Sequence, residues 1–362
     1  MSDMKTFDVS ALTDPIPSGA VKAEASERLR GESGASAETR MTVGAVVRSV
    51  VLLIGAAVLA GLFVRLVQLL FGAYEFTPST VVIALLMVVP LVVMRVRGLS
   101  QSRRDLDRGW YRLRRFAEAN GLTHTIRISD PTHPAAVFTA GTDRVSSDVV
   151  RGSVPSALGG RAFEVGNHGF DTWAARARLP HELDYVMLPL RAPSPAFTII
   201  DLSHARARPP WEPAAGQQPV ALGDGFDERF ETRCAPEAQD AVRAVLTPPV
   251  RAALTRLVAG AEVGVDLEVV EGSLYVVVRR SLPITDPTYW EWVEDLARLV
   301  DEQLDQRSDA AASLRVGEED PQRAARRARL LGRVRGGRQV AVGCLLPLLF
   351  GAVAAAVSVM WR

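Results

Sequence analysis

The chain has 362 residues, which is enough for a domain with a sizeable hydrophobic core. Its 42 lysines and arginines almost balance its 41 aspartates and glutamates, so the net charge gives no support to nucleic-acid binding. The two cysteines are Cys234 and Cys344. Because Cys344 lies in a strongly apolar run, we expect no disulfide between them, which agrees with a reducing compartment.

Residues 1–42 are polar, rich in Ser, Ala and Glu, and contain one aromatic residue, Phe7, so they predict a disordered N-terminal tail. Residues 43–97 contain two apolar runs, each long enough to cross a bilayer, and predict a two-helix transmembrane hairpin. Arg65 lies near the end of the first run. It has two interpretations: a residue at the membrane interface, or an intramembrane charge that faces a partner or a cavity.

Residues 98–320 predict a large domain of mixed secondary structure. A helix is expected over 100–120, where Asn120 and Gly121 form a natural C-terminal stop. Stretches rich in β-branched and aromatic residues follow, separated by Pro and Gly clusters. They predict strands at 123–128, 144–152, 161–168, 183–191, 197–202 and 226–234.

The second half of this domain predicts a helix at 237–245 and another that begins at Thr247-Pro248. Residues 263–280 predict a β-hairpin that turns at Glu271-Gly272. A further amphipathic helix is expected over 289–306, with its inner face formed by Trp292, Val293, Leu296, Val300 and Leu304. The predicted class is therefore an α+β cytoplasmic domain, an antiparallel sheet with helices on one side, plus three transmembrane α-helices.

Residues 321–339 form a basic juxtamembrane segment, and 340–362 predict the third transmembrane helix. The Lys/Arg bias predicts a multi-pass protein of a bacterial cell membrane, with the N-terminus and the large domain cytoplasmic and the C-terminus outside. Attraction to lipid headgroups is expected for the arginines of the basic segment. These are Arg323, Arg326, Arg327, Arg329, Arg333, Arg335 and Arg338.

A set of motifs in the large domain resembles a known family. Residues 223–230 read G-D-G-F-D-E-R-F, a V-L-T-P stretch begins at Val245, and the hairpin begins V-D-L-E-V-V. Upstream, F-A-E-A-N-G-L, D-V-V-R-G and F-E-V-G-N fit the same pattern. Over residues 100–300 the chain resembles a family of uncharacterised, mostly actinobacterial integral membrane proteins with an N-terminal transmembrane pair. The resemblance implies no activity and no catalytic residues.

Two adjacent predicted strands carry the best candidate polar cluster, which consists of Asp148, Arg151, Glu164, Asn167 and His168. These residues could form a site, or they could be cross-strand ion pairs on a solvated face. The five histidines have no metal-ligand spacing, and no phosphate-binding loop is present. We therefore expect no metal and no cofactor, and the sequence leaves open whether any catalysis occurs.

A patterned domain without a catalytic signature favours a binding, scaffold or regulatory module. One alternative is a membrane-bound enzyme with an unrecognised site. A second is a small transporter or channel subunit, for which Arg65 and Gln68 are the only support in the sequence. Membrane lipids and a cytoplasmic or membrane protein are the partners we consider, nucleic acid is not expected, and the ligand and oligomeric state stay open.

Overall fold

The structure is a computed structural model that describes residues 7–24, 105–154, 160–174, 177–191, 193–203, 209–259, 261, 263–304 and 321–332. The chain divides into two compact units, one of Met1–Leu12 with Phe116–Arg362 and the other of Thr13–Arg115. In the second unit, residues 105–115 are helical, and Arg114 pairs with Glu24 at 3.3 Å. The fold described below belongs to the first unit.

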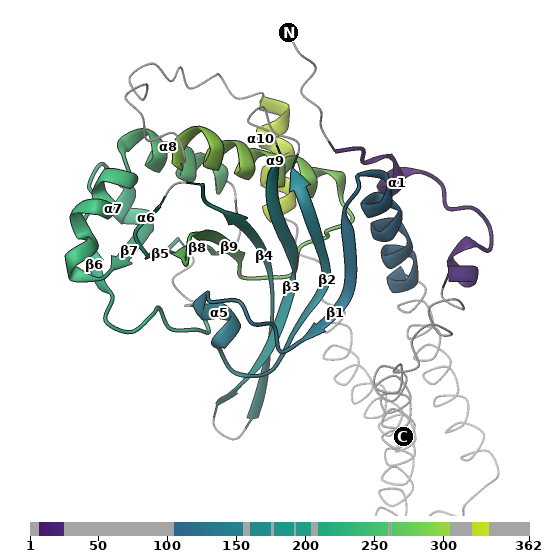
Figure 1. Ribbon diagram of the computed structural model, residues 1–362, viewed down its shortest axis with the longest axis horizontal. Coiled ribbons are helices and arrows are strands. Elements are labelled where there is room, and N and C mark those ends of the chain that lie inside the picture. Colours follow the sequence, from purple (N-terminus) through teal and green to yellow (C-terminus); the bar gives the residue numbers. More distant parts are fainter. Residues whose placement is uncertain are drawn as a thin grey trace, which may run out of the picture. The chain divides into compact units, whose positions relative to one another are not determined.

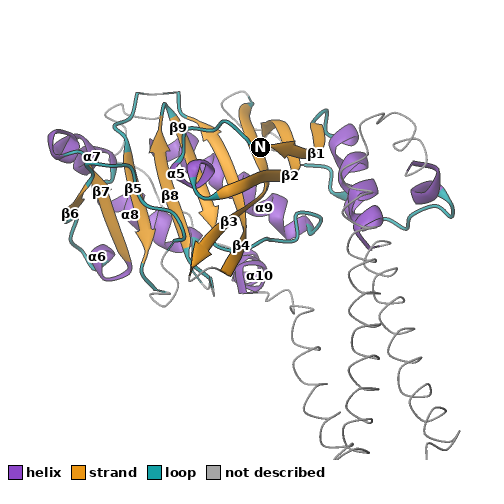
Figure 2. Cartoon of the chain, turned by 90° about the horizontal axis from the view of Figure 1, so that it is seen from below, coloured by secondary structure: helices purple, strands orange, loops and turns teal. Residues whose placement is uncertain are grey.

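The first unit is built on one nine-stranded sheet in which all neighbouring strands are antiparallel (Figures 1 and 2). The strand order is β1-β2-β3-β4-β9-β8-β5-β7-β6. The strands are β1 Thr123–Ser129, β2 Thr142–Val154, β3 Arg161–Ala174, β4 Ala177–Pro189, β5 Phe197–Asp201, β6 Gln218–Val220, β7 Phe230–Cys234, β8 Val265–Val270 and β9 Ser273–Val278.

Two local hairpin systems meet at the centre of this sheet. β1 to β4 form a meander, and β4 then pairs with β9, from Asp184 opposite Val278 to Pro189 opposite Ser273. β8 and β9 form the predicted hairpin, whose turn residues Glu271 and Gly272 have φ angles of 47° and 69°. Positive φ at both central residues is typical of a type I′ turn, so the predicted hairpin is confirmed.

Helices cover both faces of the sheet (Figure 1). α8 and α9 lie on one face, and the single-turn α5 lies on the other. α9 begins after Asp286, whose side chain accepts the Thr288 N–H at 3.0 Å as an N-cap. The helices are α1 Ser10–Thr13, α5 Ala136–Thr139, α6 Phe226–Arg229, α7 Gln239–Val245, α8 Pro248–Leu257, α9 Pro287–Leu299 and α10 Pro321–Gly332, with a 3-10 turn at Pro236–Ala238 and a π turn at Val300–Leu304.

Each face of the sheet has its own core. On the α9 face the five predicted inner residues, Trp292, Val293, Leu296, Val300 and Leu304, are all buried, as the amphipathic pattern predicts. On the α5 face the core contains Phe138, Phe170, Leu183, Tyr185, Trp211 and Tyr275. Because the central strands are covered on both sides, acidic residues such as Asp266 and Glu268 are buried as well.

The predicted fold class is wrong. The first unit is a large antiparallel sheet with few helices, and its helices lie on both sides rather than on one. The helix on the face opposite α9 is α5, which has only 4 residues. A helix this short leaves no helical periodicity in the sequence, so it was not predicted. Residues 226–229, predicted as the start of a strand, form the short helix α6.

The predicted multi-pass membrane localisation, with a cytoplasmic domain and an external C-terminus, is also corrected. Across the part of the chain that the structure describes, none of the helices has the length and apolar character needed to cross a membrane. The predicted spans within 43–97 and 340–362, and Arg65 with them, lie outside the described residues. Residues 1–42 were predicted to be disordered, but residues 7–24 are ordered in the structure, and Phe7 and Leu12 among them are buried.

Candidate functional site

A β-bulge in β2 sets the geometry of the best candidate site. β2 has one extra residue relative to β3 near its middle, and Asp148 lies there with a φ of 54°. Because side chains along a strand alternate between faces, an extra residue reverses the side on which the following residues project. Arg151 therefore lies opposite Glu164, and Ser146 opposite His168, on the same face of the sheet.

Glu164 is the hub of this face and is almost fully buried. Its Oε2 accepts a hydrogen bond from Arg151 Nε at 2.5 Å, and its Oε1 accepts one from the Tyr185 hydroxyl at 2.6 Å. His133 Nε2 lies 2.9 Å from the same Oε1. Burial by itself would raise the pKa of Glu164, but hydrogen bonds from His133, Arg151 and Tyr185 outweigh it and lower the pKa to about 2. We call these four residues the Glu164 network.

The segment that covers this face is attached through its polar groups. His133 precedes α5, and its Nδ1 lies 3.4 Å from the Tyr275 hydroxyl on β9. The Ala136 N–H donates to Glu268 Oε2 on β8 at 2.8 Å. Burial raises the pKa of both Glu268 and Tyr275. Phe138 packs among His133, Tyr185 and Tyr275, so the segment joins β4 to the distant β8–β9 hairpin.

His168 extends the polar groups along β3. Its Nδ1 lies 3.2 Å from the Ser146 hydroxyl oxygen, and its ring packs on Phe138 at 4.6 Å between centroids. The side chain is buried, and burial, together with the nearby His133, lowers the pKa of His168 to about 4. His168 is therefore neutral near pH 7, so it contributes packing and a weak polar contact rather than a charge.

Beyond His168, β3 and β4 continue as a hairpin that we call the arm, residues 170–183, with 175–176 outside the described part (Figures 1 and 2). β2 pairs with β3 as far as Asp171, and past that residue the arm is two-stranded. β9 pairs with β4 only from Asp184 onward, so this part of β4 has β3 as its one neighbour in the sheet. Phe170 stacks on His181 with centroids 5.0 Å apart, and His181 Nε2 lies 2.7 Å from the Thr172 hydroxyl oxygen.

The end of the arm exposes large apolar side chains. Trp173 is 66% exposed and Leu179 is 43% exposed. Trp173 pairs with Arg178, and Leu179 pairs with Thr172, so the two apolar side chains project from opposite faces of the hairpin. Arg178 forms ion pairs with Asp171 and with Asp143, the latter at 3.0 Å. The arm thus presents an exposed apolar residue on each face.

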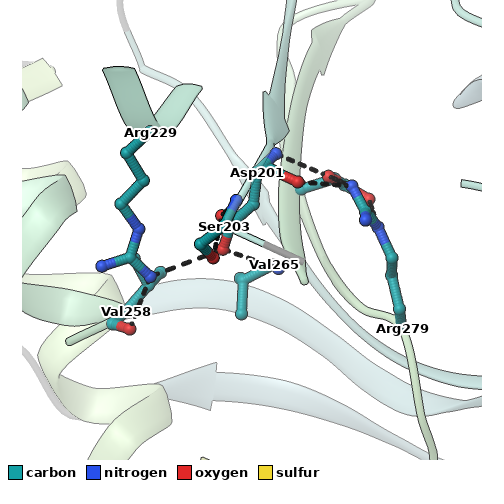
Figure 3. A network of polar contacts seen from close by, with 7 residues as sticks. Asp201, Ser203, Arg229, Val258, Val265 and Arg279 are labelled. Atoms are coloured by element: carbon teal, nitrogen blue, oxygen red, sulfur yellow. Dashed lines mark hydrogen bonds and ion pairs between the residues drawn. The ribbon is translucent and has the colours of Figure 1, made fainter. Parts of the chain in front are cut away.

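A second polar cluster lies where β5 and β9 end and β8 begins (Figure 3). Arg279 Nε and Nη2 donate to the Asp266 carboxylate at 2.7 and 2.5 Å, and Nη2 also donates to the Asp201 carbonyl at 3.0 Å. The Asp201 N–H donates to Asp266 Oδ1 at 3.0 Å. Burial raises the pKa of Asp266, and the Arg279 guanidinium offsets part of that shift.

The Asp201 carboxylate completes this cluster. It accepts hydrogen bonds from the Ser203 N–H at 2.9 Å, from the Val265 N–H at 3.3 Å and from Arg229 Nη2 at 3.4 Å. Arg229 Nη2 also donates to the Val258 carbonyl at 3.0 Å, at the end of α8 (Figure 3). These contacts satisfy buried charges and join strand ends to α8, so we assign the cluster a structural role.

Three of the five residues of the predicted polar cluster, Arg151, Glu164 and His168, lie on one face of the sheet. Arg151 contacts Glu164, whereas His168 lies four residues further along β3 and contacts Ser146. Asp148 lies in the bulge, where His124 Nε2 is 3.7 Å from its carboxylate. Asn167 projects from the other face and accepts a hydrogen bond from the Ser281 hydroxyl at 2.7 Å. Sequence reasoning missed His133, Ser146, Tyr185, Glu268 and Tyr275, which come from separate segments.

Four of the seven predicted headgroup arginines belong to α10: Arg323, Arg326, Arg327 and Arg329. Arg326 pairs with Glu291 of α9 at 3.2 Å. Leu330 and Leu331 of α10 are buried, and their carbonyls accept hydrogen bonds from Arg280 Nη2 at 2.8 and 2.6 Å. Arg333, Arg335 and Arg338 lie outside the described residues, and contact of the set with lipid headgroups stays a prediction.

Within the described ranges, no group of three or more His, Cys, Asp or Glu side chains is arranged to hold a metal ion. No protein-family model and no curated protein matches the chain. Among solved structures, the chain is similar to the crystal structure of the mycobacterial trehalose monomycolate transport factor A, TtfA. The identity is 13% and the TM-score 0.35, over 52% of this chain and 92% of that chain. A likeness this distant carries no inference about function.

Proposed function

We propose that this chain is a binding module that docks a protein partner through the arm. The observation that carries the proposal is the 66% exposure of Trp173 at the end of a paired hairpin. Leaving an indole in water forgoes the free energy that its burial would provide, and Trp is enriched among the residues that dominate protein–protein binding. An exposed Trp on an ordered element therefore favours a docking role.

The sequence of the arm suggests the chemistry of the partner surface. From Trp173 to Leu179 it reads W-A-A-R-A-R-L, with two arginines, three alanines and no acidic residue. Arg178 already pairs with Asp171 and Asp143, so the complementary partner is defined by an apolar pocket for the indole rather than by carboxylates.

The Glu164 network has a positioning role in this proposal. It lies at the base of the arm and fixes Arg151, Tyr185 and His133 around one ionised carboxylate. Phe170 and His181 continue the packed face from His168 into the arm. Because a pre-organised element loses less conformational entropy on docking than a flexible one, a rigid base supports binding by the arm.

The proposal can be tested by site-specific photocrosslinking in cells that make the protein. A photoreactive residue replaces Leu179, first with Trp173 intact and then with Trp173→Ala. We expect one discrete protein adduct, whose yield falls roughly tenfold in Trp173→Ala because a central Trp anchor is lost. The exposed Leu106, which is 51% exposed, is the matched control position and should give no such adduct.

The protein found in the adduct is then purified and titrated with the wild-type chain and with Trp173→Ala. Binding should be weakened by roughly tenfold or more, while the free energy of unfolding changes by less than about 0.5 kcal/mol, because Trp173 is exposed. An adduct that persists unchanged in Trp173→Ala, an equal adduct from position 106, or none at position 179 contradicts the proposal.

A further inference from the structure

The N-terminal segment Phe7–Leu12 packs on the first unit as a short ligand would. The Phe7 ring lies 5.8 Å from Phe116, 5.8 Å from Phe163 and 5.3 Å from Trp290, measured between centroids. Phe7 is 5% exposed. The pocket thus surrounds one side chain with three aromatic rings, an arrangement in which edge-to-face contacts add to the burial of apolar surface.

The main chain of the segment is recognised as well. The Phe7 N–H donates to Glu294 Oε1 of α9 at 2.8 Å. The Asp8 N–H donates to Asn120 Oδ1 at 2.8 Å, and Asn120 Nδ2 donates to the Asp8 carbonyl at 2.9 Å. A side-chain amide that pairs with both the N–H and the C=O of one residue reproduces the bonding of a neighbouring β-strand.

The segment holds its own bound shape. The Asp8 carboxylate accepts the Ser10 N–H at 3.0 Å, and hydrogen bonds to Ser10 lower the pKa of Asp8. This turn leads into α1, where Leu12 is 2% exposed and provides a second apolar anchor. A peptide that folds its own turn loses less entropy when it docks than an unstructured one.

We infer that Phe116, Asn120, Phe163, Trp290 and Glu294 form a peptide-docking groove, and that the N-terminal segment of a second copy of this chain can occupy it. The contact of Phe7 with Glu294 joins residues 287 positions apart in sequence, and that of Asp8 with Asn120 joins residues 112 positions apart. Because the segment is far in sequence from the groove that it occupies, the groove of one copy can accept the segment of another copy through the same contacts. Each copy supplies one segment and one groove, and Phe7 and Leu12 provide the side-chain specificity.

The first test asks whether the groove accepts the segment in trans. A labelled peptide of residues 5–14 is titrated into the full-length Phe7→Ala chain, whose own segment lacks its anchor. We expect saturable binding that is roughly tenfold or more tighter than to the wild-type chain, whose groove is filled. A peptide with Phe7→Ala should bind roughly tenfold more weakly, and Asn120→Ala added to the receiving chain should weaken binding further.

If Phe7→Ala lowers the content of folded protein, Phe7→Leu replaces it, since Leu keeps part of the packing but lacks the aromatic edge contacts and so competes more weakly with the peptide. Two results would contradict a groove that accepts the segment in trans. One is equal peptide binding by the wild-type and Phe7→Ala chains, and the other is no binding by a receiving chain that circular dichroism shows to be folded. Equal binding of the peptides with and without Phe7→Ala would contradict the role of Phe7 as the anchor.

The second test asks whether the occupant is a second copy. Full-length Phe7→Ala, with a free groove, is mixed with full-length Asn120→Ala, with an intact segment and a weakened groove. Sedimentation should show a 1:1 complex in the mixture. At the same total concentration, each variant alone should form roughly tenfold less dimer. Peptide binding without any complex in the mixture overturns exchange between copies. A Trp173→Ala substitution in both chains should leave the complex unchanged, which separates this groove from the arm.

Discussion

Glu164 stays ionised although it is buried, because three donors converge on its carboxylate. Glu164→Gln removes the charge and places an amide N–H₂ group against at least one of these donors. We expect the free energy of unfolding to fall by about 2–4 kcal/mol, since a buried charge partner is lost while part of Arg151 is solvated. Urea denaturation of the two proteins measures the difference.

Glu182 supplies the control for this substitution. It lies on β4 and is exposed. Glu182→Gln should change the free energy of unfolding by no more than about 0.5 kcal/mol. A loss for Glu164→Gln as small as that for Glu182→Gln would show that the carboxylate is not a hub.

His168 provides a pH dependence whose sign follows from its burial. The folded protein lowers the pKa of this imidazole from 6.5 to about 4, mainly by burial. Between these values the unfolded chain binds more protons, so the stabilisation is full above pH 6.5 and is lost as the pH falls toward 4. As the pH falls from about 7 to about 5, protonation of His168 in the unfolded state should lower the free energy of unfolding by about 2 kcal/mol.

His168→Gln removes the titrating group, so the difference in unfolding free energy between these two pH values should shrink by about 2 kcal/mol. Measurements at about pH 8 and about pH 9, where the imidazole is neutral in both the folded and the unfolded state, serve as the internal control. An unchanged slope between pH 7 and pH 5 would mean that His168 is not the titrating residue.

At the scale of elements, β3 contains a matched pair of glycines. A Cβ at Gly166 would lie 3.2 Å from the Tyr185 hydroxyl and ring and from the Ser147 carbonyl, whereas one at Gly169 would have its nearest neighbour at 3.5 Å. Gly166→Ala should displace Tyr185 from Glu164 and lower the free energy of unfolding by about 1–2 kcal/mol. Gly169→Ala should be neutral or slightly stabilising, because Ala loses less entropy than Gly in a strand.

Thermal unfolding of Gly166→Ala and Gly169→Ala checks this prediction. The Gly166→Ala substitution made in the Glu164→Gln protein, with unfolding followed by fluorescence, tests the cause. If Gly166→Ala acts through Tyr185 and Glu164, it should lower the free energy of unfolding by less in the Glu164→Gln protein than in the wild type, because the effects of neighbouring substitutions are not additive. Equal costs for both glycines, or a cost at Gly166 that is independent of Glu164, would contradict the assigned mechanism.

At the scale of the whole molecule, the sheet has well-covered central strands and exposed edges. β9 is buried over five of its six residues, whereas no residue of β1 is fully buried. Amide protons of β9, and of β4 from Asp184 to Pro189, should therefore exchange only through global unfolding, and those of β1 through local opening of lower free energy. Hydrogen exchange read by mass spectrometry measures this gradient, and equal protection of β1 and β9 would contradict it.

The sequence by itself determined the elements whose signals are local. The Glu271-Gly272 turn, the Thr247-Pro248 helix start and the inner face of α9 all depend on residues within a few positions of one another, and all are present. The length of the arm was missed because its end is exposed on both faces, and strands exposed in this way have no alternating apolar pattern.

Only the tertiary structure decided which residues meet. Arg151, Glu164 and His168 were predictable as neighbours on paired strands, but the bulge at Asp148 decides that they share a face. The pairing of β4 with β9, the cover at α5 and the docking of Phe7 against α9 join residues that are distant in sequence. Such contacts depend on the closure of long loops and on complementary shape, and neither leaves a periodic signal in the sequence.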